Sequence, residues 1–400
     1  MRAVRFHYRP LRYVLTRLLS GRLPAMGAGR LGFVRLDDVP RRALPADDWV
    51  RLEPRLSGIC GSDLGVITAH DSFTLEPYGA YPFTFGHEVV ATVAETGAAV
   101  TRWSEGDRVI LNPMLACEQK GEDPCAACRR GDPGVCRRAT DGSGSIAGFS
   151  PLTGGGWADE LVAHESMLRP QGDLPDEVAV LTDAYASAAK GVFLEPPRAD
   201  DVVLVIGAGN IGLLMVRALR RIGWEGTIAV SARYGFQAEK AKALGADVVV
   251  RGRDQLYEWA SSLPGADTFE PSLAPRFVEG GPSLVYDSVG SAGTVRDALA
   301  LTREEGRIVV TGAAAVSKVD LTRLWHRQLR MTGVMVYGPV EWQGRSRDIF
   351  DATLDLIRGD DLGRFNLLTH TFELEEYRDA IRVALGKEDH GAIKVGVRVR

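Results

Sequence analysis

The stretch DDVVLVIGAGNIGLLMVRALRRIG, at residues 200–223, decides how the C-terminal half of this chain folds. It has the pattern of a buried strand, a tight turn and a helix in direct succession. Gly207 permits the turn, Gly209 lets the backbone approach a pyrophosphate, and Gly212 lets the helix pack closely on the strand. Because a strand precedes the glycines and a helix follows them, the stretch predicts a dinucleotide-binding unit.

The helix after these glycines begins at Asn210 and Ile211, and we expect its N-terminus to face the cofactor phosphates. Further apolar runs follow along the chain, with helical stretches among them: GTIAV, ADVVV, SLVYDSVG, RIVVTGA and RMTGVMVYG. This alternation predicts a parallel sheet that is covered by helices on both faces. Residues 263–282 have the composition of an extra surface excursion within this unit.

The corner after the second strand of this unit indicates which cofactor the chain prefers. In such units an acidic residue about 20 positions past the glycines binds the ribose hydroxyls of NAD. Residues 227–238 contain neither aspartate nor glutamate. Arg233 can instead face a 2′-phosphate, Ser231 can donate a hydrogen bond to it, and Tyr234 can pack beside the adenine. The corner predicts a preference for NADP(H). The alternative is that Arg233 points to solvent and that the chain uses either cofactor.

The stretch PCAACRRGDPGVC, at residues 124–136, brings three of the chain's five cysteines close together. Cys125 and Cys128 form a C-x-x-C pair, and turn-forming residues lead to Cys136. With Cys117 as a fourth thiolate, the cluster predicts a closed tetrahedral site, which suits structural zinc. The alternative is two disulfides or free surface thiols, which such close spacing in a cytosolic chain disfavours.

A second set of metal-ligand residues is spread over three other stretches. Cys60 lies in LSGICGSD, His87 and Glu88 lie in FGHEVV, and Asp183 lies in LTDAYASAAKGV. Each residue alone has an ordinary explanation, such as core packing for a cysteine or helix capping for an aspartate. Together they offer a thiolate, an imidazole and a carboxylate, which leave a fourth position open for water or substrate, as catalytic zinc requires.

Composition and charge narrow the class of protein. Four hundred residues predict two domains, and 45% apolar with 25% charged residues is the balance of a soluble globular protein. The net charge of −4 gives no reason to expect nucleic acid or an anionic membrane as a partner. An odd number of cysteines disfavours a secreted disulfide framework, so we expect a cytoplasmic location.

The N-terminal segment, residues 1–36, contains eight arginines and no acidic residue. Apolar residues recur at helical spacing within it, namely Leu11, Val14, Leu15, Leu18 and Leu19. A basic amphipathic helix of this kind can lie on a membrane or serve as a transit segment. We expect instead that its apolar stripe packs on its own domain or on a neighbouring subunit, as amphipathic helices in soluble proteins usually do.

The order of the motifs resembles that of one protein family. GICGSD, GHEVVATVAETG, GDRVI, the C-x2-C-x7-C cluster, GGWADELV and the late nucleotide unit follow one another as in the zinc-dependent medium-chain alcohol dehydrogenases. Any one motif is weak evidence, but the ordered set is specific. The resemblance covers most of the chain, from Met1 to the C-terminal GAIKVGVRV.

This resemblance implies an α/β fold with two domains. A GroES-like β-rich catalytic domain is split around a Rossmann domain, whose parallel sheet is doubly wound. The implied catalytic domain comprises residues 1–186, with a structural zinc lobe at about 112–140. Residues 187–338 then form the Rossmann domain, and residues 339–400 return to the catalytic domain.

The resemblance also implies roles for single residues near the second metal-ligand set. Cys60, His87 and Asp183 match the catalytic zinc ligands of the family. Glu88 matches the carboxylate behind the metal, which can also coordinate it. Ser62 matches the hydroxyl that takes the alcohol proton. The remaining matches are Asp63 as the carboxylate that orients His87, and Gly312 and Ala313 as residues that run close to the nicotinamide.

The chain departs from the family pattern in ways that bear on function. Cys117 lies eight residues before Cys125, where the family usually has three. The family often has a histidine five residues after the zinc cysteine, which passes the proton to solvent. Here that residue is Gly65, and His70 is a candidate substitute.

The span between the zinc cysteine and the GHE motif is also longer than usual. The stretch DSFTLEPYGAYPF, at residues 71–83, fills it. Because this stretch is rich in aromatic residues, we expect it near the substrate mouth, with an ordinary surface loop as the alternative. Further candidates for the pocket walls, from their proximity to the motifs, are Tyr81, Phe85, Trp103, Asn112 and Met114.

These observations predict a zinc-dependent oxidoreductase that transfers a hydride between a primary or secondary alcohol and NADP(H), and reversibly reduces the aldehyde or ketone. A polyol, a sugar and an aryl alcohol fit the sequence about equally. One alternative is an NADPH-dependent reductase of an activated double bond or iminium on the same scaffold. Another is a non-catalytic dinucleotide-binding protein. We expect two zinc ions per chain, NADP with NAD as the alternative, a small-molecule substrate and a homo-oligomer, either a dimer or a tetramer.

Overall fold

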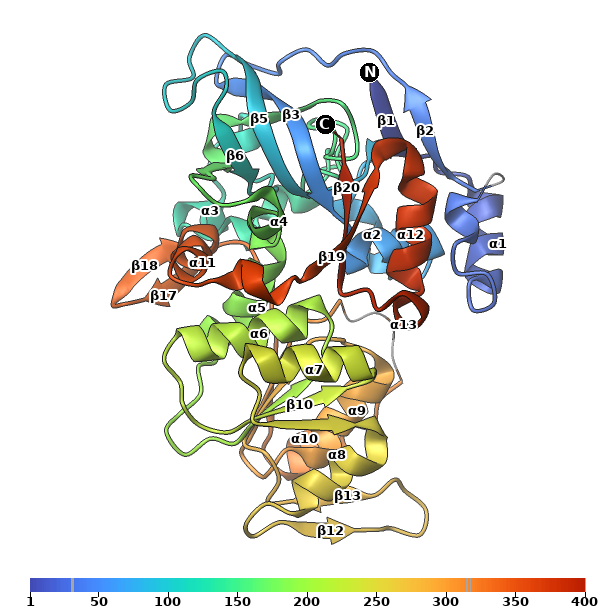
Figure 1. Cartoon of the computed structure of the whole chain (residues 1–400), viewed down its shortest axis with the longest axis vertical. Coiled ribbons are helices and arrows are strands. Elements are labelled where there is room, and N and C mark those ends of the chain that lie inside the picture. The colour runs from blue at the N-terminus through green and yellow to red at the C-terminus, as the bar shows by residue number, and fades with distance from the viewer. Residues whose placement is uncertain (30–31, 314–315, 317, 400) are drawn as a thin grey trace. The chain divides into compact units, whose positions relative to one another are not determined.

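The computed structural model describes the chain except residues 30–31, 314–315, 317 and 400 (Figure 1). Its contacts divide the chain into two compact units. Unit 1 comprises Met1–Asp183, Tyr337–Pro339 and Asn366–Arg400, and unit 2 comprises Ala184–Val336 and Val340–Phe365.

The larger β-sheet of unit 1 has the strand order β19-β20-β3-β5-β6-β8, and β7 also pairs with β3. Its strands are β3 (Trp49–Gly58), β5 (Glu88–Thr96), β6 (Arg108–Leu111), β7 (Leu161–His164), β8 (Leu168–Pro170), β19 (Leu368–Glu373) and β20 (Lys394–Arg398). The last strand of the chain, β20, pairs antiparallel with β3, so that Gly396 lies opposite Gly58 (Figure 1). The two ends of the chain therefore build one sheet.

A smaller sheet of unit 1, with the order β2-β1-β4, carries an aromatic core. Its strands are β1 (Arg2–Phe6), β2 (Val34–Asp38) and β4 (Phe83–Thr84). Phe6 stacks on Phe83 with ring centroids 5.1 Å apart, and Phe85 meets Phe83 edge to face at 5.1 Å. Each of these fully buried rings contributes about 1.5–3 kcal/mol of transfer free energy. This core holds β1 beside the segment that follows residue 82.

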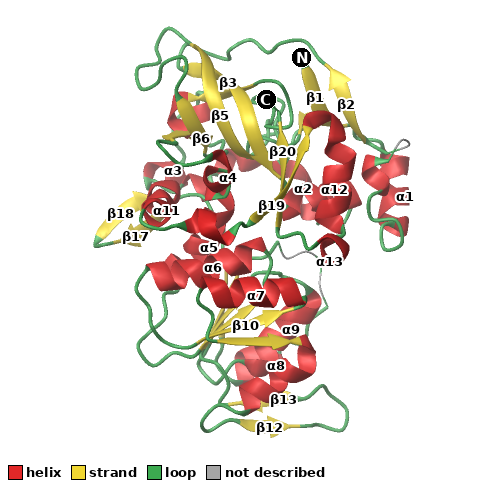
Figure 2. Ribbon diagram, viewed as in Figure 1, coloured by secondary structure: helices red, strands yellow, loops and turns green. Residues whose placement is uncertain are grey.

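The helices of unit 1 connect these strands (Figure 2). They are α1 (Pro10–Leu19), α2 (Gly61–Thr68), α3 (Ala126–Arg129), α4 (Asp176–Ala179), α12 (Tyr377–Leu385) and α13 (Lys387–His390), with α5 (Thr182–Leu194) crossing into unit 2. Short 3-10 helices are η1 (Met26–Ala28), η2 (Phe73–Tyr78), η3 (Glu118–Lys120), η4 (Pro133–Val135), η5 (Arg137–Thr140), η6 (Glu165–Met167) and η8 (Leu374–Glu376). Residues at helical spacing on α12 are buried against the core of this unit: Tyr377, Ala380, Ile381 and Ala384.

Unit 2 has the parallel sheet that the sequence predicted. Its order is β11-β10-β9-β14-β15-β16, so the chain runs outward from β9 on one side and then returns to start again beside β9 at β14. This is a doubly wound Rossmann sheet, in which cofactors bind at the carboxyl ends of the two central strands. The strands are β9 (Val203–Ile206), β10 (Ile228–Ala232), β11 (Val248–Arg251), β14 (Leu284–Asp287), β15 (Arg307–Val310) and β16 (Arg330–Gly333).

Helices cover both faces of this sheet, α6 and α7 on one side and α9 and α10 on the other (Figure 1). The helices are α6 (Asn210–Arg221), α7 (Gly235–Leu244), α8 (Gly252–Ser261), α9 (Ala292–Leu301), α10 (Thr322–His326) and α11 (Ile349–Arg358), with the 3-10 helix η7 (Leu362–Phe365). The excursion at residues 263–282 contains an antiparallel pair, β12 (Asp267–Phe269) with β13 (Phe277–Glu279), which its sequence did not predict. A further pair joins β17 (Pro339–Trp342) and β18 (Arg345–Asp348).

The segment 340–365 differs from the division expected from the sequence. We expected all of 339–400 to return to the catalytic domain, but this segment packs within unit 2. Asp360 forms an ion pair with Arg217 of α6, and the rings of Trp342 and Phe193 lie 5.0 Å apart. The aliphatic face of α11 is buried in the same unit.

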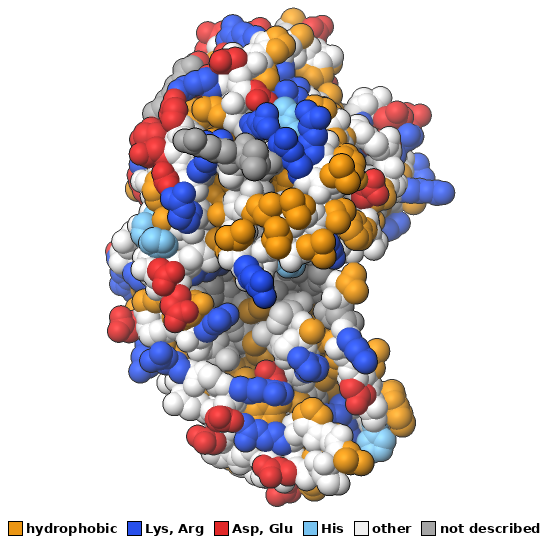
Figure 3. Space-filling view, turned by 90° about the vertical axis from the view of Figure 1, so that its right-hand side faces the viewer, with side chains coloured by type: hydrophobic (Ala, Val, Ile, Leu, Met, Phe, Trp, Pro, Cys, Tyr) orange, Lys and Arg blue, Asp and Glu red, His pale blue; other side chains and the backbone are white. Residues whose placement is uncertain are grey.

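Helix α1 forms where the N-terminal stripe predicted a helix, but the stripe does not pack on unit 1. Leu11, Val14, Leu15 and Leu18 are exposed, and Thr16 is the buried residue of the helix. Figure 3 shows hydrophobic side chains gathered on the face that carries α1. The expectation that the apolar stripe of α1 packs on its own domain is therefore wrong. Within the described residues, none of the helices combines the length and the apolar character that crossing a membrane requires.

Candidate functional site

The beginning of α2 brings Cys60, Asp63 and His87 together. Cys60 is the N-cap of this helix, and its backbone N–H donates to Asp63 Oδ2 at 2.9 Å. The other oxygen, Asp63 Oδ1, lies 3.6 Å from His87 Nδ1. Burial acts to lower the pKa of His87, but the charges of Asp63 and Cys60 outweigh burial and raise it well above its usual value. Asp63 thus lies next to both the cysteine and the histidine.

Glu88 begins β5 and lies on the other side of the same group. It forms an ion pair with Lys394 of β20, and both side chains are almost fully buried. Gly58 makes room for this pair, because a β-carbon at residue 58 would overlap Glu88 Oε2. Burial acts to lower the pKa of Lys394, but the charge of Glu88 outweighs burial and raises it.

Asp183 is buried at the beginning of α5 and accepts a hydrogen bond from Tyr337. The phenol of Tyr337 lies 3.2 Å from Asp183 Oδ2. Burial raises the pKa of Asp183 to about 6. Among the described residues, Cys60, His87 and Glu88 form a group whose ligand atoms all lie within 4.8 Å of one another. Asp183 does not belong to this group.

The donor chemistry of this group fits a zinc ion. Cys60, His87 and Glu88 offer a thiol, an imidazole and a carboxylate, which are the ligand types of catalytic zinc sites. His87 Nδ1 is buried without a hydrogen-bond partner, and Asp63 Oδ1 lies 3.6 Å from it. A bound cation would compensate the thiolate and the carboxylates that meet here.

A cavity of about 220 Å³ opens in unit 1 beside this group. Ser62, two residues after Cys60, lines the cavity. Phe149 also lines it, and the ring of Phe149 lies 5.6 Å from the ring of His87. Aromatic side chains dominate the remaining walls: Phe6, Tyr8, Tyr13, Phe73, Tyr78, Tyr81 and Phe83. The inserted stretch 71–83 therefore borders a cavity, as we expected for the substrate mouth.

Among the wall candidates chosen from the sequence, Tyr81 lines this cavity. Phe85 belongs to the aromatic core and is fully buried. Trp103 packs against the core beneath β5 and β6, and its indole N–H donates to the carbonyl of Glu165 at 3.0 Å. Asn112 accepts a hydrogen bond from the backbone N–H of Met114. The inserted stretch 71–83 thus supplies much of the cavity wall, and four of the five wall candidates do not line it.

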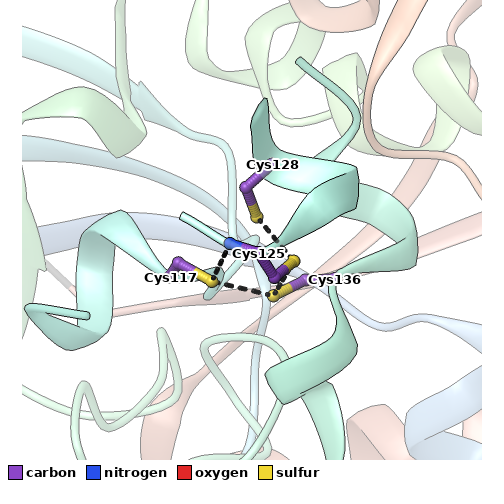
Figure 4. A group of neighbouring side chains, drawn as sticks. All are labelled: Cys117, Cys125, Cys128 and Cys136. Atoms are coloured by element: carbon purple, nitrogen blue, oxygen red, sulfur yellow. Dashed lines mark hydrogen bonds between the residues drawn. The ribbon is translucent and has the colours of Figure 1, made fainter. Parts of the chain in front are cut away.

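The four clustered cysteines meet in one lobe of unit 1 (Figure 4). Cys117 Sγ and Cys136 Sγ lie 3.6 Å apart, and Cys125 Sγ lies 3.6 Å from Cys128 Sγ. All five cysteines of the chain carry free thiols, so the alternative of disulfides finds no support. Backbone N–H groups lower the pKa of Cys125 to about 6, whereas burial raises the pKa of Cys128 to about 12. Four convergent sulfurs are a donor set that suits structural zinc.

The glycines of residues 200–223 have steric reasons for their positions. Gly207 has a φ of +99°, which favours glycine. A β-carbon at Gly212 would overlap the carbonyl oxygen of Gly207, so only glycine lets α6 pack this closely on the turn. Nothing lies within 4 Å of a β-carbon at Gly209, which leaves the backbone there open. Asn210 and Ile211 form the first turn of α6 behind this opening.

The corner after β10 carries the residues that the sequence singled out. Arg233 is exposed, and its guanidinium lies over the ring of Tyr234, 5.3 Å from the centroid. Ser231 stands near the end of β10. The next strand adds a second arginine, because Arg251 pairs in register with Ala232. On the other side of β9, Gly312 and Ala313 follow β15. The Gly312 N–H donates to the carbonyl of Asp287 at 3.1 Å.

Two family models match the chain. Residues 46–176 match the alcohol dehydrogenase GroES-like domain, and residues 210–351 match the zinc-binding dehydrogenase family. Together the two ranges cover more than half of the chain. The chain belongs to the medium-chain dehydrogenase family.

This medium-chain dehydrogenase has similar proteins across most of its length. It is 26% identical over 351 residues to starvation-sensing protein RspB of Escherichia coli, which covers 86% of this chain and 91% of that protein. It is 29% identical over 362 residues to a probable alcohol dehydrogenase of Mycobacterium tuberculosis, which covers 86% and 89%. Its fold matches 2R,3R-butanediol dehydrogenase from Bacillus subtilis with a TM-score of 0.72 and 21% identity, over 100% and 99% of the two chains. These findings support alcohol oxidoreduction as the general class of activity.

Some residues of the medium-chain dehydrogenase site were not among those chosen from the sequence. Lys394 and Tyr337 contact Glu88 and Asp183 from late in the chain, and Arg251 stands beside the cofactor corner. Asp71 lines the cavity near Ser62. A signal for Lys394 was available, because a lysine in the apolar run GAIKVGVRV is unusual for a central strand and suggests a buried ionic partner.

Proposed function

We propose that this medium-chain dehydrogenase is a zinc-dependent oxidoreductase that transfers a hydride between an alcohol and NADP(H), and that it reversibly reduces the aldehyde or ketone. The observation that carries the proposal is the meeting of Cys60, His87 and Glu88 beside a cavity that Ser62 lines. A thiol, an imidazole and a carboxylate next to a free hydroxyl suit the oxidation of an alcohol. The cytoplasmic location and the homo-oligomeric state stay predictions of the sequence.

Cys60 and His87 would hold the catalytic zinc whether the third ligand is Glu88 or Asp183. We infer that Asp183 is the third ligand and that Glu88 stays with Lys394 behind the metal. The ion pair supports this choice, because a carboxylate that neutralises a buried lysine is costly to withdraw. When bound, zinc supplies Lewis acidity that lowers the pKa of the alcohol hydroxyl. The four-cysteine lobe would hold a second zinc ion that stabilises the fold.

Ser62 takes the proton of the alcohol in this proposal. Its hydroxyl lies in the wall of the cavity and on the first turn of α2, next to the cysteine. Asp63 keeps its carboxylate between Cys60 and His87, which fixes the orientation of the imidazole. The nicotinamide supplies the acceptor for the hydride when the cofactor is bound.

The cavity walls favour an aryl or otherwise apolar alcohol over a polyol. Eight aromatic side chains line the cavity, including Phe149 beside His87 and Phe73 and Tyr81 from the inserted stretch. A polyol hydroxyl that faces one of these rings would lack a partner, and each buried unpaired hydroxyl costs about 1–3 kcal/mol. An aromatic ring gains about 0.5–1.5 kcal/mol from each favourable ring contact.

The preference for NADP(H) rests on the corner after β10. Arg233 and Arg251 stand at the carboxyl ends of neighbouring strands, and residues 227–238 contain no carboxylate. The 2′-phosphate of NADP would meet two guanidinium groups there and no like charge. The ribose of NAD would lack the acidic partner that the fold usually supplies.

The proposal is tested by a panel of aryl alcohols, aliphatic alcohols, polyols and the matching carbonyls. Each is offered with NADP(H) and with NAD(H), and absorbance of the reduced cofactor is followed. Turnover of an aryl alcohol with NADP, faster than of any polyol, is expected. Turnover of a polyol alone would contradict the substrate class.

One observation favours a second activity, the reduction of an activated double bond or iminium. The residue that carries the proton relay in relatives is Gly65 here, and some reductions need no such path. Enones and cyclic imines with NADPH therefore belong in the same panel. Turnover of these compounds without any turnover of alcohols would favour this alternative.

A further inference from the structure

A carboxylate fills the space beside Gly65. A β-carbon at Gly65 would overlap Asp71 Oδ1, so the Asp71 carboxyl fills the space that a side chain at residue 65 would need. Asp71 and Ser62 line the same cavity. A side chain from the following loop thus occupies the place that a side chain at residue 65 of α2 would take.

The end of α2 explains how Asp71 comes back over the helix. Ala69 ends the helix in the left-handed region, with a φ of 56°. Its N–H and the N–H of His70 both return to the carbonyl of Gly65, the latter at 2.9 Å. The chain therefore reverses within two residues, and the half-buried Asp71 side chain lies against the helix beside Gly65.

Helix α1 fixes this reversed segment from outside. Arg17 Nη1 donates to the carbonyls of Ala69 at 2.9 Å and Asp71 at 3.1 Å. The same guanidinium lies over the ring of Phe73, 4.7 Å from its centroid. The guanidinium is therefore engaged by backbone oxygens and a ring, and it holds the backbone at residue 71 while the carboxyl turns to the cavity.

We propose that Asp71 accepts the proton that Ser62 takes from the alcohol, and that it passes this proton to solvent. The proposal rests on the proposed function. As the alcohol proton moves to Ser62 Oγ, the hydroxyl proton of Ser62 moves through cavity water to the Asp71 carboxylate. The hydride leaves with its electron pair to the nicotinamide, so Ser62 is unchanged and Asp71 is protonated once per turnover. Release of that proton to solvent restores the carboxylate.

The charged surroundings of Asp71 suit this role. Burial, helped by the charge of Asp63 and opposed by the charge of Arg17, raises the pKa of Asp71 to about 7. Tyr13 of α1 and Tyr81 also face it from the cavity wall. A group with a pKa near the working pH can both take up and release a proton efficiently.

His70, the substitute that the sequence suggested, is placed less well. Its side chain is exposed and does not line the cavity, and its Nδ1 lies 3.4 Å from Ser20 Oγ. His70→Ala therefore serves as the matched control for Asp71→Asn, since the two residues are neighbours in the same loop.

The first experiment compares the zinc-loaded wild type, Asp71→Asn and His70→Ala in alcohol oxidation with NADP across pH 5.5 to 9. We expect kcat of Asp71→Asn to fall about a hundredfold, the lower end of the loss for an acid–base group. The limb of the pH profile near 7 should disappear in this variant and persist in His70→Ala. Added imidazole should restore turnover of Asp71→Ala, because a small base can accept the proton in the emptied space.

The second experiment moves the relay back to its usual place. Gly65→His alone should be impaired, because its side chain overlaps Asp71, whereas Gly65→His combined with Asp71→Ala should recover much of the lost kcat. A readout independent of turnover is the 13C NMR titration of the Asp71 carboxyl in the whole protein, which should give a pKa near 7. Matched zinc content and unfolding midpoints show that the variants are folded.

The outcomes separate the relay from the function. An active wild type with an unchanged pH profile in Asp71→Asn, or an Asp71 carboxyl that titrates near 4, overturns the relay and leaves the proposed function standing. A wild type that oxidises no alcohol of the panel overturns the proposed function and the relay with it.

Discussion

Lys394 neutralises Glu88 inside unit 1, and the two residues come from strands at opposite ends of the chain. Lys394 Nζ also donates to the carbonyl of Ile59 at 3.0 Å, directly before Cys60. One ammonium group therefore ties β20 to the Glu88 carboxylate and to the backbone that leads into Cys60.

Lys394→Met should destabilise the protein strongly. Removing one partner leaves the other charge buried without compensation, which costs about 3–5 kcal/mol. Urea unfolding of the purified variant, followed by fluorescence, measures the loss. The double variant Lys394→Met, Glu88→Gln should recover a large part of it, because the uncompensated charge is gone. A single variant as stable as the wild type would show that Glu88 has another partner.

Metal analysis should find two zinc ions per chain, because two separate ligand groups are present. Cys60→Ser should retain one ion, lose turnover and unfold at a midpoint close to that of the wild type. Cys128→Ser should also lose one ion but should unfold at lower temperature, since structural zinc contributes directly to folding. If Cys60→Ser unfolded at lower temperature and Cys128→Ser did not, the group at Cys60 would be the structural site and the four-cysteine group the catalytic one.

Arg233→Ala should raise KM for NADP far more than KM for NAD. A lost charge-assisted contact to the 2′-phosphate costs about 1.5–3 kcal/mol, or roughly tenfold to a hundredfold. Arg251→Ala should act in the same direction if both guanidinium groups face the phosphate. Saturation curves with both cofactors measure the change. A wild type that prefers NAD would refute this interpretation of the corner.

Stability at low pH should depend on Asp176 at the beginning of α4. Arg55 donates to both of its oxygens at 2.9 Å, and Arg108 and Gln171 add further bonds. Burial acts to raise the pKa of Asp176, but the bonds from Arg55, Gln171 and Arg108 outweigh burial and lower it.

Because the pKa is lower in the folded state, this stabilisation is complete above the unfolded pKa of about 3.9 and is lost as pH falls below it. Asp176→Asn should therefore lower the free energy of unfolding by about 1–3 kcal/mol at pH 7 and by less at pH 3.5. The exposed Asp173→Asn is the control, with little expected effect at either pH. An equal loss for Asp176→Asn at both pH values would point to packing instead of charge.

Local patterns carried most of what could be predicted from the sequence. The glycines of residues 200–223 and the spacing of the clustered cysteines depend on steric and coordination rules that act within a few residues. The doubly wound sheet of unit 2 and the convergence of the four thiols followed from them. Residues far apart could be joined only through the family resemblance, as with Cys60 and His87.

Features that depend on tertiary packing could not be predicted from the sequence. The place of Asp71 depends on a left-handed residue at the end of α2, which no glycine signalled because Ala69 takes that conformation. The amphipathic pattern of α11 indicates a buried face but not the unit that buries it. Likewise the leucines of α1 formed the expected helix, yet their spacing could not show that the stripe is exposed.

The pairing of β20 with β3 has a consequence for biosynthesis. A ribosome releases β3 early, but this strand lacks one of its neighbours until residues 394–398 have left the exit tunnel. Unit 2 is complete in sequence at residue 365, so it can fold before the last strand of unit 1 has been synthesised. During that interval residues 56–58 of β3 and the Glu88 carboxylate lack their native partners. A chaperone that recognises unpaired strand edges would act in this window, and a premature stop shortly before Lys394 would yield a cofactor-binding unit attached to an unfinished sheet.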